Sequence, residues 1–591
     1  MIPSPLRDPL IVPAVAAAIF LGCIISPPAL MDDVDAVQAQ IGRNMLDSGD
    51  WVTARLDGVA YLEKSPLKYW MIAVAFRIFG VHDWAARLPL ALSTVVLCWL
   101  VFLAGAWAFS RRAGVYAGCA LATSVGLFLF TRIQIPDAIL TATITLALWS
   151  FLRALDSKEQ RPGLWASVMA ASVGIGLLLK GLIAVLFPVA AAALFLLFTG
   201  EWRVRETWRR LHLVRGVLLA LAIAAPWHIL ATLRNPPYFD FTMHSGPGEY
   251  RGFFWFYFFN EHILRFLNTR YPRDYNTVPR LYFWLFHLLW LFPWSVYFPA
   301  VAKLSFSTKA TDRAGRMRLL CLCWTGFLLI FFTFSSTQEY YSMPCYPALA
   351  LLIGVALTEP QAAAWVRRGQ IVLATVVGAA TVTIAIILSQ VWNLPAPGDI
   401  SRALITQDVS AYTLSLGHMG DLTLASFAYL RTPLILAGIA FLIGAVTAYK
   451  RSIAGAVVMM VLFIHAARLA LVTFDPYLSS RPLAEALNSA PRGKLILDDQ
   501  YYTFSSVVFY TGQRVLLLNG RVNNLEYGSY APDAPQDVFI DDAGFQQRWQ
   551  SGDLYYICVE GTQVPRLEKL VGKTALHELI GSGGKYVFSN R

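Results

Sequence analysis

Long uninterrupted apolar segments recur along most of this chain of 591 residues, and they leave few folds open to it. A helix of about 20 mostly apolar residues crosses the hydrocarbon core of a membrane. Only 14% of the residues are charged, whereas soluble domains carry about 25%. We therefore predict a polytopic α-helical membrane protein. About thirteen spans are expected, beginning near residues 10, 88, 114, 138, 164, 182, 212, 281, 318, 344, 370, 432 and 453.

The distribution of Lys and Arg predicts which loops face the cytoplasm. Basic loops favour the cytoplasmic side of a membrane. If the N-terminus is cytoplasmic, every loop assigned to that side is basic, as in 203–215 and 303–318. Three long loops of mixed charge, 31–86, 233–279 and 391–431, then share the other face. Because long loops are usually functional, we predict that the working face is external.

The apolar spans end near Val472, and the remaining chain alternates strand-like runs with helical patches. We predict a transmembrane domain over 1–473 and a soluble α/β domain over 474–591. An odd number of spans places this second domain on the external side as well. The run Gly581-Ser582-Gly583-Gly584 lacks the strand and helix that flank a phosphate-binding loop, so it indicates a hairpin turn.

Three aspartates, Asp32, Asp33 and Asp35, follow the first span directly. Like charges crowded at a membrane boundary favour a carboxylate that takes up a proton near neutral pH, as proton abstraction from a hydroxyl requires. The alternative is a solvated helix N-terminus, where Asp is favoured by capping and by the helix dipole. Spacing alone leaves both interpretations open.

The segment Tyr61-Leu62-Glu63-Lys64-Ser65-Pro66 is predicted to form a turn at the membrane surface between two interfacial helices, 36–46 and 67–79. Lys64 in that turn is either an anchor to lipid headgroups or a compact charge that binds the phosphate of a lipid carrier. Both hypotheses place Glu63 and Lys64 on the external face.

Two charged residues interrupt apolar runs further along the chain. Asp137 begins a span shortly after Arg132, so that a carboxylate and a guanidinium share one external helix end. Lys180 lies in a tight turn between two apolar runs. A charge at the centre of a bilayer costs about 2.5–3.5 kcal/mol, and such residues are functional candidates. Lys180 could equally extend its ammonium outward to the interface.

Two further external segments combine aromatic and polar residues. Glu261 and His262 precede Arg265 by four and three residues, which is helical spacing. His262 alone would be interpreted as structural, but beside an arginine it becomes a candidate for contact with an anion or an acceptor. Tyr340 and Tyr341 follow a hydroxyl-rich loop, where they either donate to phosphate oxygens or anchor the end of a helix.

Several classes of function find no support in the sequence. The net charge of +11 is explained by basic cytoplasmic loops, so we expect no nucleic-acid partner. The seven cysteines are scattered and form neither a zinc-site spacing nor a disulfide framework. We expect no metal and no cofactor, and we find no nucleotide-sugar site. Membrane lipids are the expected surroundings, and a monomer is the expected state.

These residues together resemble bacterial aminoarabinose transferases, which belong with the protein O-mannosyltransferase-like, lipid-carrier-dependent GT-C glycosyltransferases. The likeness covers roughly residues 10–360. It is carried by Asp50–Thr53, Tyr61–Trp70, Phe79-Gly80, Ala86–Pro89, Leu179–Gly181, Glu261–Phe266 and Tyr340–Pro347.

The resemblance implies a GT-C fold of about thirteen spans and an enzyme that moves a sugar from a polyprenyl-phosphate (undecaprenyl-phosphate) donor, typically with inversion. The acceptor is implied to be a cell-envelope hydroxyl or phosphate on the periplasmic face of the bacterial inner membrane. The resemblance also implies residue roles. The catalytic candidates are Asp33 and Asp35, then Asp32 and Asp137; the carrier-phosphate ligands are Lys64, Arg265, Lys180, Tyr340 and Tyr341; the cavity is lined by Glu63, Glu261 and His262.

This chain departs from the family pattern at two places. The family commonly has Asp-Glu shortly before Tyr-Ala in its first loop, whereas this chain has Val34-Asp35 before Gln38-Ala39. The identity of the base is therefore open by one or two positions. The family often has Lys where this chain has Gln338, so that one contact to the carrier phosphate or the sugar is expected to differ.

Two other functions were considered. A flippase or transporter of lipid-linked saccharides would carry broken helices and internal repeats, but no repeat is found and the charges gather on one face. A non-catalytic envelope assembly protein is favoured only if the aspartate cluster is dispensable. The sequence leaves open which sugar is transferred and whether the acceptor is lipid A, another glycolipid, a polysaccharide or a protein.

Overall fold

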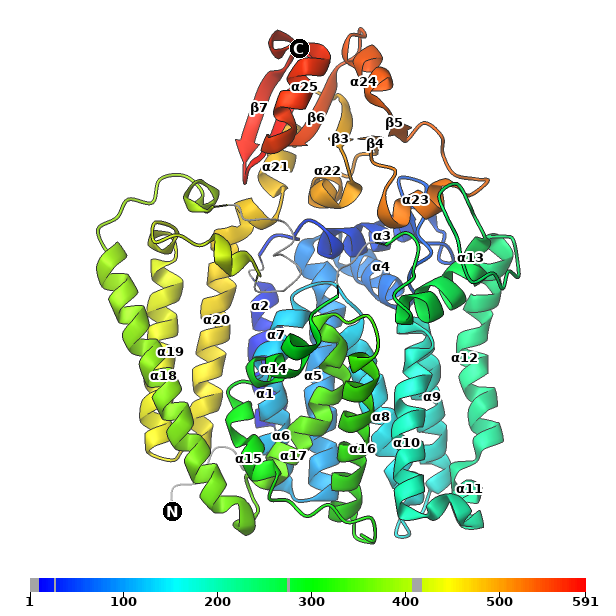
Figure 1. The fold of residues 1–591 in the computed structure, drawn as a ribbon, viewed down its shortest axis with the longest axis vertical. Coiled ribbons are helices and arrows are strands. Elements are labelled where there is room, and N and C mark those ends of the chain that lie inside the picture. Colours follow the sequence, from blue (N-terminus) through cyan, green and yellow to red (C-terminus); the bar gives the residue numbers. More distant parts are fainter. Residues whose placement is uncertain (1–9, 26–27, 274–276, 406–416) are drawn as a thin grey trace.

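The computed structural model describes residues 10–25, 28–273, 277–405 and 417–591. Parts of the predicted loops 233–279 and 391–431 therefore lie outside the described residues. A bundle of helices forms the larger part of the molecule, and a small domain that contains a β-sheet covers one end of it (Figure 1).

Apolar helices build the bundle. Among the described residues, eight helices are long and apolar enough to cross a membrane, or ten if two bent pairs each count as one span. The bundle helices are α1 (Ile11–Phe20), α2 (Gly22–Ile25), α5 (Asp83–Ala108), α6 (Arg111–Ala122), α7 (Val125–Thr131), α8 (Asp137–Leu155), α9 (Pro162–Lys180), α10 (Ile183–Thr199), α11 (Arg205–Leu211), α12 (Leu213–Arg234), α14 (Arg280–Trp290), α15 (Phe298–Val301), α16 (Arg313–Thr333), α17 (Tyr346–Ala356), α18 (Ala363–Val391), α19 (Arg431–Tyr449) and α20 (Ile453–Leu478).

The predicted many-span helical fold is confirmed, and each of the thirteen predicted spans coincides with an apolar helix. The number thirteen itself stays a prediction. Five of these helices are short: α1 has 10 residues, α6 has 12, α10 has 17, and α14 and α17 have 11 each. A helix of 11 residues rises only about 17 Å, which is less than the hydrocarbon core.

Burial separates a central helix from peripheral ones. In α8, 78% of the residues in the apolar window are buried, whereas the value is 22% for the span that contains α12 and 11% for the span that contains α18. Lipid is as apolar as leucine, so helices at the edge of a bundle keep apolar side chains exposed. Asp137, the residue that begins α8, is therefore held by the most buried of the eight membrane-length helices in the described part of the chain.

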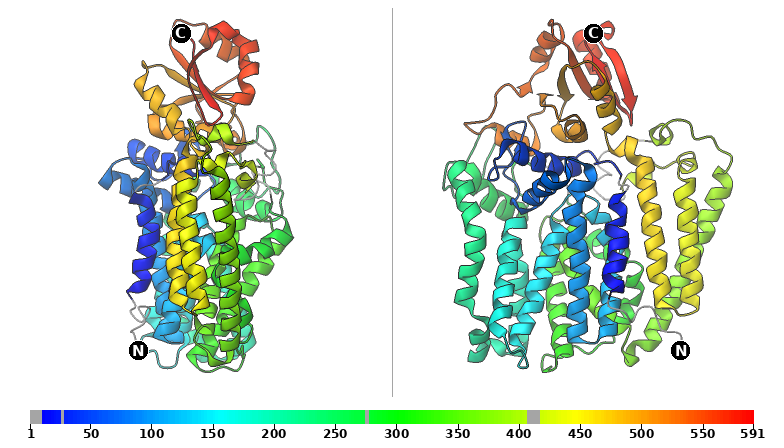
Figure 2. Two further views of the ribbon diagram at one scale, coloured as in Figure 1. Left: turned by 90° about the vertical axis from the view of Figure 1, so that its left-hand side faces the viewer. Right: turned by 180° about the vertical axis from the view of Figure 1, so that it is seen from behind.

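The first long loop, predicted to be external, forms two helices, α3 (Val34–Ser48) and α4 (Leu67–Phe79), joined by the hairpin β1 (Arg55–Leu56) and β2 (Val59–Ala60). Both helices lie across the end of the bundle, beneath the sheet domain (Figure 2). They approach closely, since a Cβ on Gly42 would come within 2.6 Å of Ile72. The predicted pair of helices at this surface is confirmed, with α3 longer at both ends than expected.

The C-terminal domain contains a six-stranded mixed sheet in the order β5-β4-β3-β6-β8-β7. The predicted strand-like runs form β3, β4 and β6, which pair in parallel, and the glycine run forms the turn of the antiparallel β7–β8 hairpin. Its elements are α21 (Arg481–Ser489), β3 (Lys494–Asp498), α22 (Ser505–Thr511), β4 (Val515–Leu518), α23 (Asn523–Ser529), β5 (Phe539–Ile540), α24 (Asp542–Trp549), β6 (Tyr555–Glu560), α25 (Val564–Val571), β7 (His577–Ser582) and β8 (Lys585–Ser589).

The β1–β2 hairpin touches this domain through Asp57. Oδ1 of Asp57 accepts a hydrogen bond from the backbone N–H of Val515 at 3.4 Å, and Oδ2 is buried without a hydrogen-bond partner among the described residues. Burial raises the pKa of Asp57 to about 7, although the Val515 N–H and the nearby Arg514 act in the opposite direction. The carboxyl is therefore partly protonated near neutral pH.

We expect Asp57 to make the folded chain less stable as the pH rises. Below pH 4 the carboxyl is protonated in both states, but between pH 4 and pH 7 it ionises in the unfolded chain first, so stability falls until the folded-state pKa is passed. Compared with the wild type, Asp57→Asn should have a higher thermal midpoint of unfolding at pH 8 and a smaller difference from the wild type at pH 5. The midpoint of the variant should therefore depend less on pH. Thermal unfolding in detergent at both pH values measures it. Asp537→Asn, at an exposed position, is the control; an equal response of both variants would contradict the prediction.

Candidate functional site

A cavity of about 360 Å³ lies where the long loops meet the ends of the central helices. It brings together nine of the twelve predicted site residues. These are Glu63, Lys64, Asp137, Lys180, Glu261, His262, Arg265, Tyr340 and Tyr341. They are contributed by five separate stretches of the chain, and apolar residues complete the wall.

The turn between β2 and α4 supplies Glu63 and Lys64. Glu63 is almost fully buried, with 8% of its side chain exposed, and its Oε1 contacts the Lys64 ammonium. Oε2 accepts hydrogen bonds from the Tyr61 hydroxyl and from the Asn524 amide, each at 2.7 Å. Asn524 belongs to α23, so the C-terminal domain holds one wall of the cavity in place.

Arg265 follows a π-helix, Trp255–Leu264, in the second external loop. π-Helical turns are rare and frequently occur at functional sites. Arg265 lies 2.7 Å from Glu261 and 3.5 Å from Glu63, so the predicted i,i+4 pair of Glu261 and Arg265 is confirmed. Behind it, the fully buried Arg270 contacts the other oxygen of Glu261.

The surrounding cations determine the charge of Glu63. Burial alone would raise the pKa of its carboxyl, but Lys64, Arg270 and Arg265 outweigh burial and hold the pKa well below the usual range for glutamate. Glu63 is therefore ionised at neutral pH. A carboxylate with so low a pKa is a weak base, and we assign it to the orientation of Lys64 and Arg265.

Asp137 and Lys180 form a second charged pair across the cavity, with Lys180 Nζ 2.6 Å from Asp137 Oδ1. The Lys180 ammonium also lies 5.1 Å and 5.0 Å from the ring centroids of Tyr340 and Tyr341, within the range of a cation–π contact. Oδ2 of Asp137 is buried and has no hydrogen-bond partner in the part of the chain that the structure describes. Lys180 thus extends into the cavity, and one oxygen of Asp137 is left for a ligand.

His262 fastens the turn that presents Lys180. Its Nε2 accepts the backbone N–H of Leu182 at 3.0 Å, and its Nδ1 lies 2.6 Å from the carbonyl of Tyr257, to which it donates in the matching tautomer. Burial lowers the pKa of His262, which favours this neutral form. Gly181, at φ 68°, lies against the ring, since a Cβ there would come within 2.4 Å of His262 Nε2. Both ring nitrogens are therefore engaged within the protein, Nε2 by the turn and Nδ1 by the π-helix.

The three first-loop aspartates do not line this cavity. Asp35 is 1% exposed, and its carboxylate accepts from Arg87 at 2.8 Å and from the backbone N–H groups of Met31 and Gln134, each at 3.1 Å. Its two oxygens are thus used within the protein. Asp33 directly precedes α3, with φ 73°, and is exposed.

Asp32 ties the first loop to the C-terminal domain. Oδ2 lies 2.6 Å from the Lys585 ammonium, and Oδ1 accepts from the hydroxyl and the backbone N–H of Ser506 at 2.7 and 2.9 Å. Ser480 adds a hydroxyl contact at 2.5 Å. These contacts explain Asp32 as a structural link between the domains.

We expect Asp32→Asn to destabilise the chain strongly. Removing one partner of a buried ion pair costs about 3–5 kcal/mol, because the other charge is left uncompensated. The thermal midpoint in detergent should fall by several degrees, while affinity for a polyprenyl-phosphate ligand should not change. Asp553→Asn breaks the exposed pair with Lys494, in which both side chains are 60% exposed, and should have little effect. Equal losses in the two variants would contradict this role.

Several residues of the site were not predicted. Arg270 and Asn524 hold Glu261 and Glu63, and Lys68 is 3% exposed in α4 with Gln38 Oε1 3.3 Å from its ammonium. A lysine in an amphipathic helix gives no sign in sequence that it is buried. Arg270 and Asn524 are separated by 254 residues, so only the tertiary structure brings them together.

No group of three His, Cys, Asp or Glu residues that could hold a metal ion occurs within residues 10–25, 28–273, 277–405 and 417–591. The charged residues of the cavity consist of three cations, Lys64, Lys180 and Arg265, and three carboxylates, Glu63, Asp137 and Glu261. Each cation is thus held beside a carboxylate and points toward a space with an apolar wall. Such an arrangement suits an anionic headgroup on an apolar chain.

A family model described as dolichyl-phosphate-mannose-protein mannosyltransferase matches residues 63–230. Undecaprenyl phosphate-alpha-4-amino-4-deoxy-L-arabinose arabinosyl transferase 1 of Pseudomonas fluorescens (strain Pf0-1) is 31% identical, covering 54% of this chain and 52% of the relative. The corresponding transferase 1 of Proteus mirabilis (strain HI4320) is 29% identical, covering 54% of each chain. The chain spans about half the length of the curated relatives it matches.

The likeness to a solved structure extends over nearly the whole chain. The crystal structure of ArnT from Cupriavidus metallidurans bound to undecaprenyl phosphate is 21% identical, with a TM-score of 0.76, and the match covers 98% of both chains. The apo structure of the same protein gives a TM-score of 0.75. The predicted GT-C fold is confirmed by this likeness, and so is the resemblance to aminoarabinose transferases.

Proposed function

We propose, from this resemblance to aminoarabinose transferases, that the chain is a membrane glycosyltransferase that moves a sugar from a polyprenyl-phosphate donor to a cell-envelope acceptor. The observation that carries the proposal is the convergence of Lys64, Lys180 and Arg265 on one cavity with an apolar flank. A polyprenyl phosphate has an anionic head and an apolar chain, and the cavity offers a surface for each. The similar ArnT was crystallised with undecaprenyl phosphate, and we propose the same class of carrier here.

The donor would lie with its phosphate between Lys64 and Arg265. Arg265 offers planar paired donors and Lys64 a compact charge, and both suit phosphate oxygens. The lipid chain would follow Leu182 and Leu186, which line the cavity and are 41% and 38% exposed. Exposed leucines beside a charged cavity give the chain an exit toward the membrane.

Transfer requires one bond to form and one to break. An acceptor oxygen attacks the anomeric carbon of the sugar, and the bond from that carbon to the phosphate oxygen breaks. The phosphate leaves with the electron pair, and positive groups placed where this charge develops lower the barrier. Lys64 and Arg265 are proposed for that role, with Lys180, Tyr340 and Tyr341 beside them.

An acceptor hydroxyl must lose its proton during the attack, and we propose Asp137 as the base. Its Oδ1 is oriented by Lys180 while its buried Oδ2 has no partner among the described residues, and it lines the cavity. Asp35 remains a candidate only if its contacts with Arg87 open. Asp33, which is exposed outside the cavity lining, is supported less than Asp137.

The orientation and partners are part of the same proposal. Basic loops at the opposite ends of the spans support a periplasmic site and a periplasmic C-terminal domain in a bacterial inner membrane. The acceptor is proposed to be a lipid A-like glycolipid, a polysaccharide or a protein, and the chain is proposed to act as a monomer. The cavity residues themselves do not distinguish these acceptors.

Mass spectrometry of envelope glycolipids tests the function most directly. Cells that lack the gene should lose one glycan mass on one acceptor, and the purified full-length chain in detergent should restore that mass from the matching polyprenyl-phosphate sugar. Restoration in detergent excludes a flippase, since transport across a bilayer is then impossible. Two results together would favour a transporter. The folded, purified chain would transfer no sugar, and the deletion strain would retain lipid-linked sugar on the cytoplasmic leaflet.

A further inference from the structure

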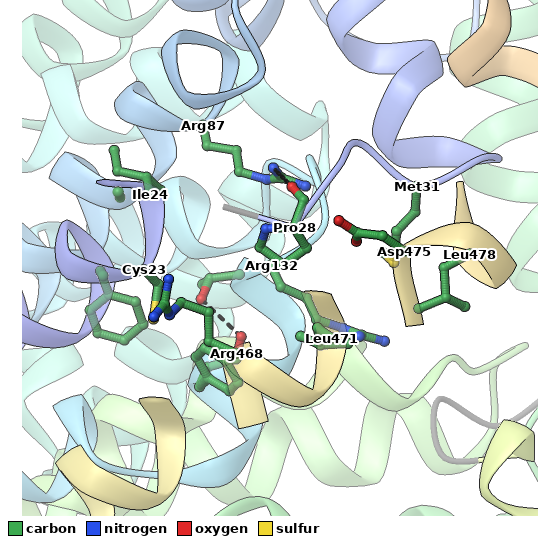
Figure 3. Close-up of a pocket in the computed structure, with 14 residues that line it drawn as sticks. Cys23, Ile24, Pro28, Met31, Arg87, Arg132, Arg468, Leu471, Asp475 and Leu478 are labelled. Carbon is green, nitrogen blue, oxygen red and sulfur yellow. Dashed lines mark hydrogen bonds between the residues drawn. The ribbon is translucent and has the colours of Figure 1, made fainter. Parts of the chain in front are cut away.

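A second, smaller cavity of about 60 Å³ lies among the ends of α2, α5, α7 and α20 (Figure 3). It shares no lining residue with the larger cavity. Its lining elements end on the side of the C-terminal domain (Figure 1).

Three arginines from three different elements surround this space: Arg87, Arg132 and Arg468. The lining contains one carboxylate, Asp475, whose Oδ2 accepts the backbone N–H of Ala29 at 2.9 Å. The formal charge of the lining is therefore three positive and one negative. An excess of positive charge in a partly apolar site attracts an anion.

Arg87 has a structural task that leaves its charge mostly compensated. It donates to the carbonyls of Pro28 at 2.6 Å and Ala29 at 3.1 Å, and it pairs with Asp35 at 2.8 Å. These bonds hold the chain that enters the first external loop. Arg87 therefore shapes one wall of the cavity, and Arg132 is the main candidate to bind a ligand, with Arg468 also in the lining.

Arg132 is the residue that points to a ligand. Its Nε is buried, and its guanidinium has no hydrogen bond or ion pair within the described part of the chain, although the Asp35 carboxylate, which is paired with Arg87, attracts it from beyond ion-pair distance. A buried charge without a partner is expensive, whereas a guanidinium binds a phosphate through paired, charge-assisted hydrogen bonds. An anion in the cavity would supply the missing partner.

The rest of the lining is apolar and includes Phe20, Ile24, Phe128 and Leu471. These residues belong to helices of the bundle. We propose that Arg132 and Arg468, with Arg87 behind them, form a binding site for the phosphate headgroup of a membrane lipid, separate from the larger cavity. The site does not depend on the proposed sugar transfer.

Native mass spectrometry of the purified full-length chain tests the proposal. After incubation with mixed micelles that contain phosphatidylglycerol, the wild type should retain one lipid with at least tenfold higher affinity than Arg132→Gln. Arg132→Lys should fall between them, because it keeps the charge and loses the paired donors. Arg468→Gln alters the opposite wall and should also weaken retention, so the test does not rest on one variant.

A competition experiment and a control variant make the result specific to the lipid headgroup and to this cavity. Competition by millimolar inorganic phosphate would identify a free phosphate as a sufficient ligand, whereas retention that phosphate does not displace identifies the lipid headgroup. Arg367→Gln, at an exposed position of α18, is the control and should bind like the wild type. Equal retention of phosphatidylglycerol by the wild type, Arg132→Gln and Arg468→Gln, or equal retention of uncharged diacylglycerol by the wild type, would overturn the site.

Discussion

Asp137→Asn should abolish most sugar transfer while leaving donor binding in place. Asparagine keeps the shape of the side chain but cannot accept a proton, and loss of a general base typically costs about 10²–10⁴-fold in rate. Because Lys180 at 2.6 Å would keep an amide oxygen to contact, the turn that holds Lys180 should persist. We expect kcat to fall by at least about 100-fold with a small change in KM for the donor. A transfer assay in detergent with purified chain measures both.

The competing assignments are tested in the same assay. Asp33→Asn and Asp35→Asn should each retain more transfer than Asp137→Asn, and Asp35→Asn should instead lower the thermal midpoint, because Arg87 would lose its buried partner. Asp47→Asn, an exposed carboxylate of the first loop with 63% of its side chain exposed, is the control. Full sugar transfer by Asp137→Asn would show that Asp137 is not the base.

Lys64→Ala and Arg265→Ala should each weaken binding of the donor by about tenfold or more. A hydrogen bond to a charged group contributes about 1.5–3 kcal/mol, and tenfold in affinity corresponds to about 1.4 kcal/mol. The loss should appear in the dissociation constant for undecaprenyl phosphate, measured by scintillation proximity or native mass spectrometry. High salt should reduce the difference little, because the two side chains are only 22% and 16% exposed.

Two variants separate charge from geometry at this site. Lys64→Arg should retain part of the affinity, whereas Arg265→Lys should lose the paired donors and leave Glu261 less well held. Arg234→Ala removes an exposed arginine that pairs with Asp50 at 2.8 Å outside the cavity lining, and it serves as the matched control. Unchanged donor affinity in both alanine variants would rule out the proposed phosphate contacts.

The spans could be predicted from the sequence because the bilayer is a strong constraint on each segment by itself. Each of the thirteen predicted spans rests on a local apolar run. The prediction of strands β3, β4 and β6 rests on local apolar runs in the same way. The placement of Lys180 in a turn between two apolar runs could likewise be predicted from the neighbouring sequence alone. Lengths were less predictable, since α17 has 11 residues and is supported by neighbouring helices rather than by its own hydrophobic length.

The sequence by itself determined that this is a many-span membrane protein whose charged residues gather on one face, and it identified nine residues that line one cavity. Which carboxylate has an oxygen left for a ligand was decided only by the tertiary structure. Asp32 and Asp35 are engaged by Lys585 and Arg87, partners distant in sequence, whereas Asp137 keeps one buried oxygen unpartnered among the described residues. Hydrophobic runs act within one segment, but a carboxylate's role depends on which charges the fold brings beside it.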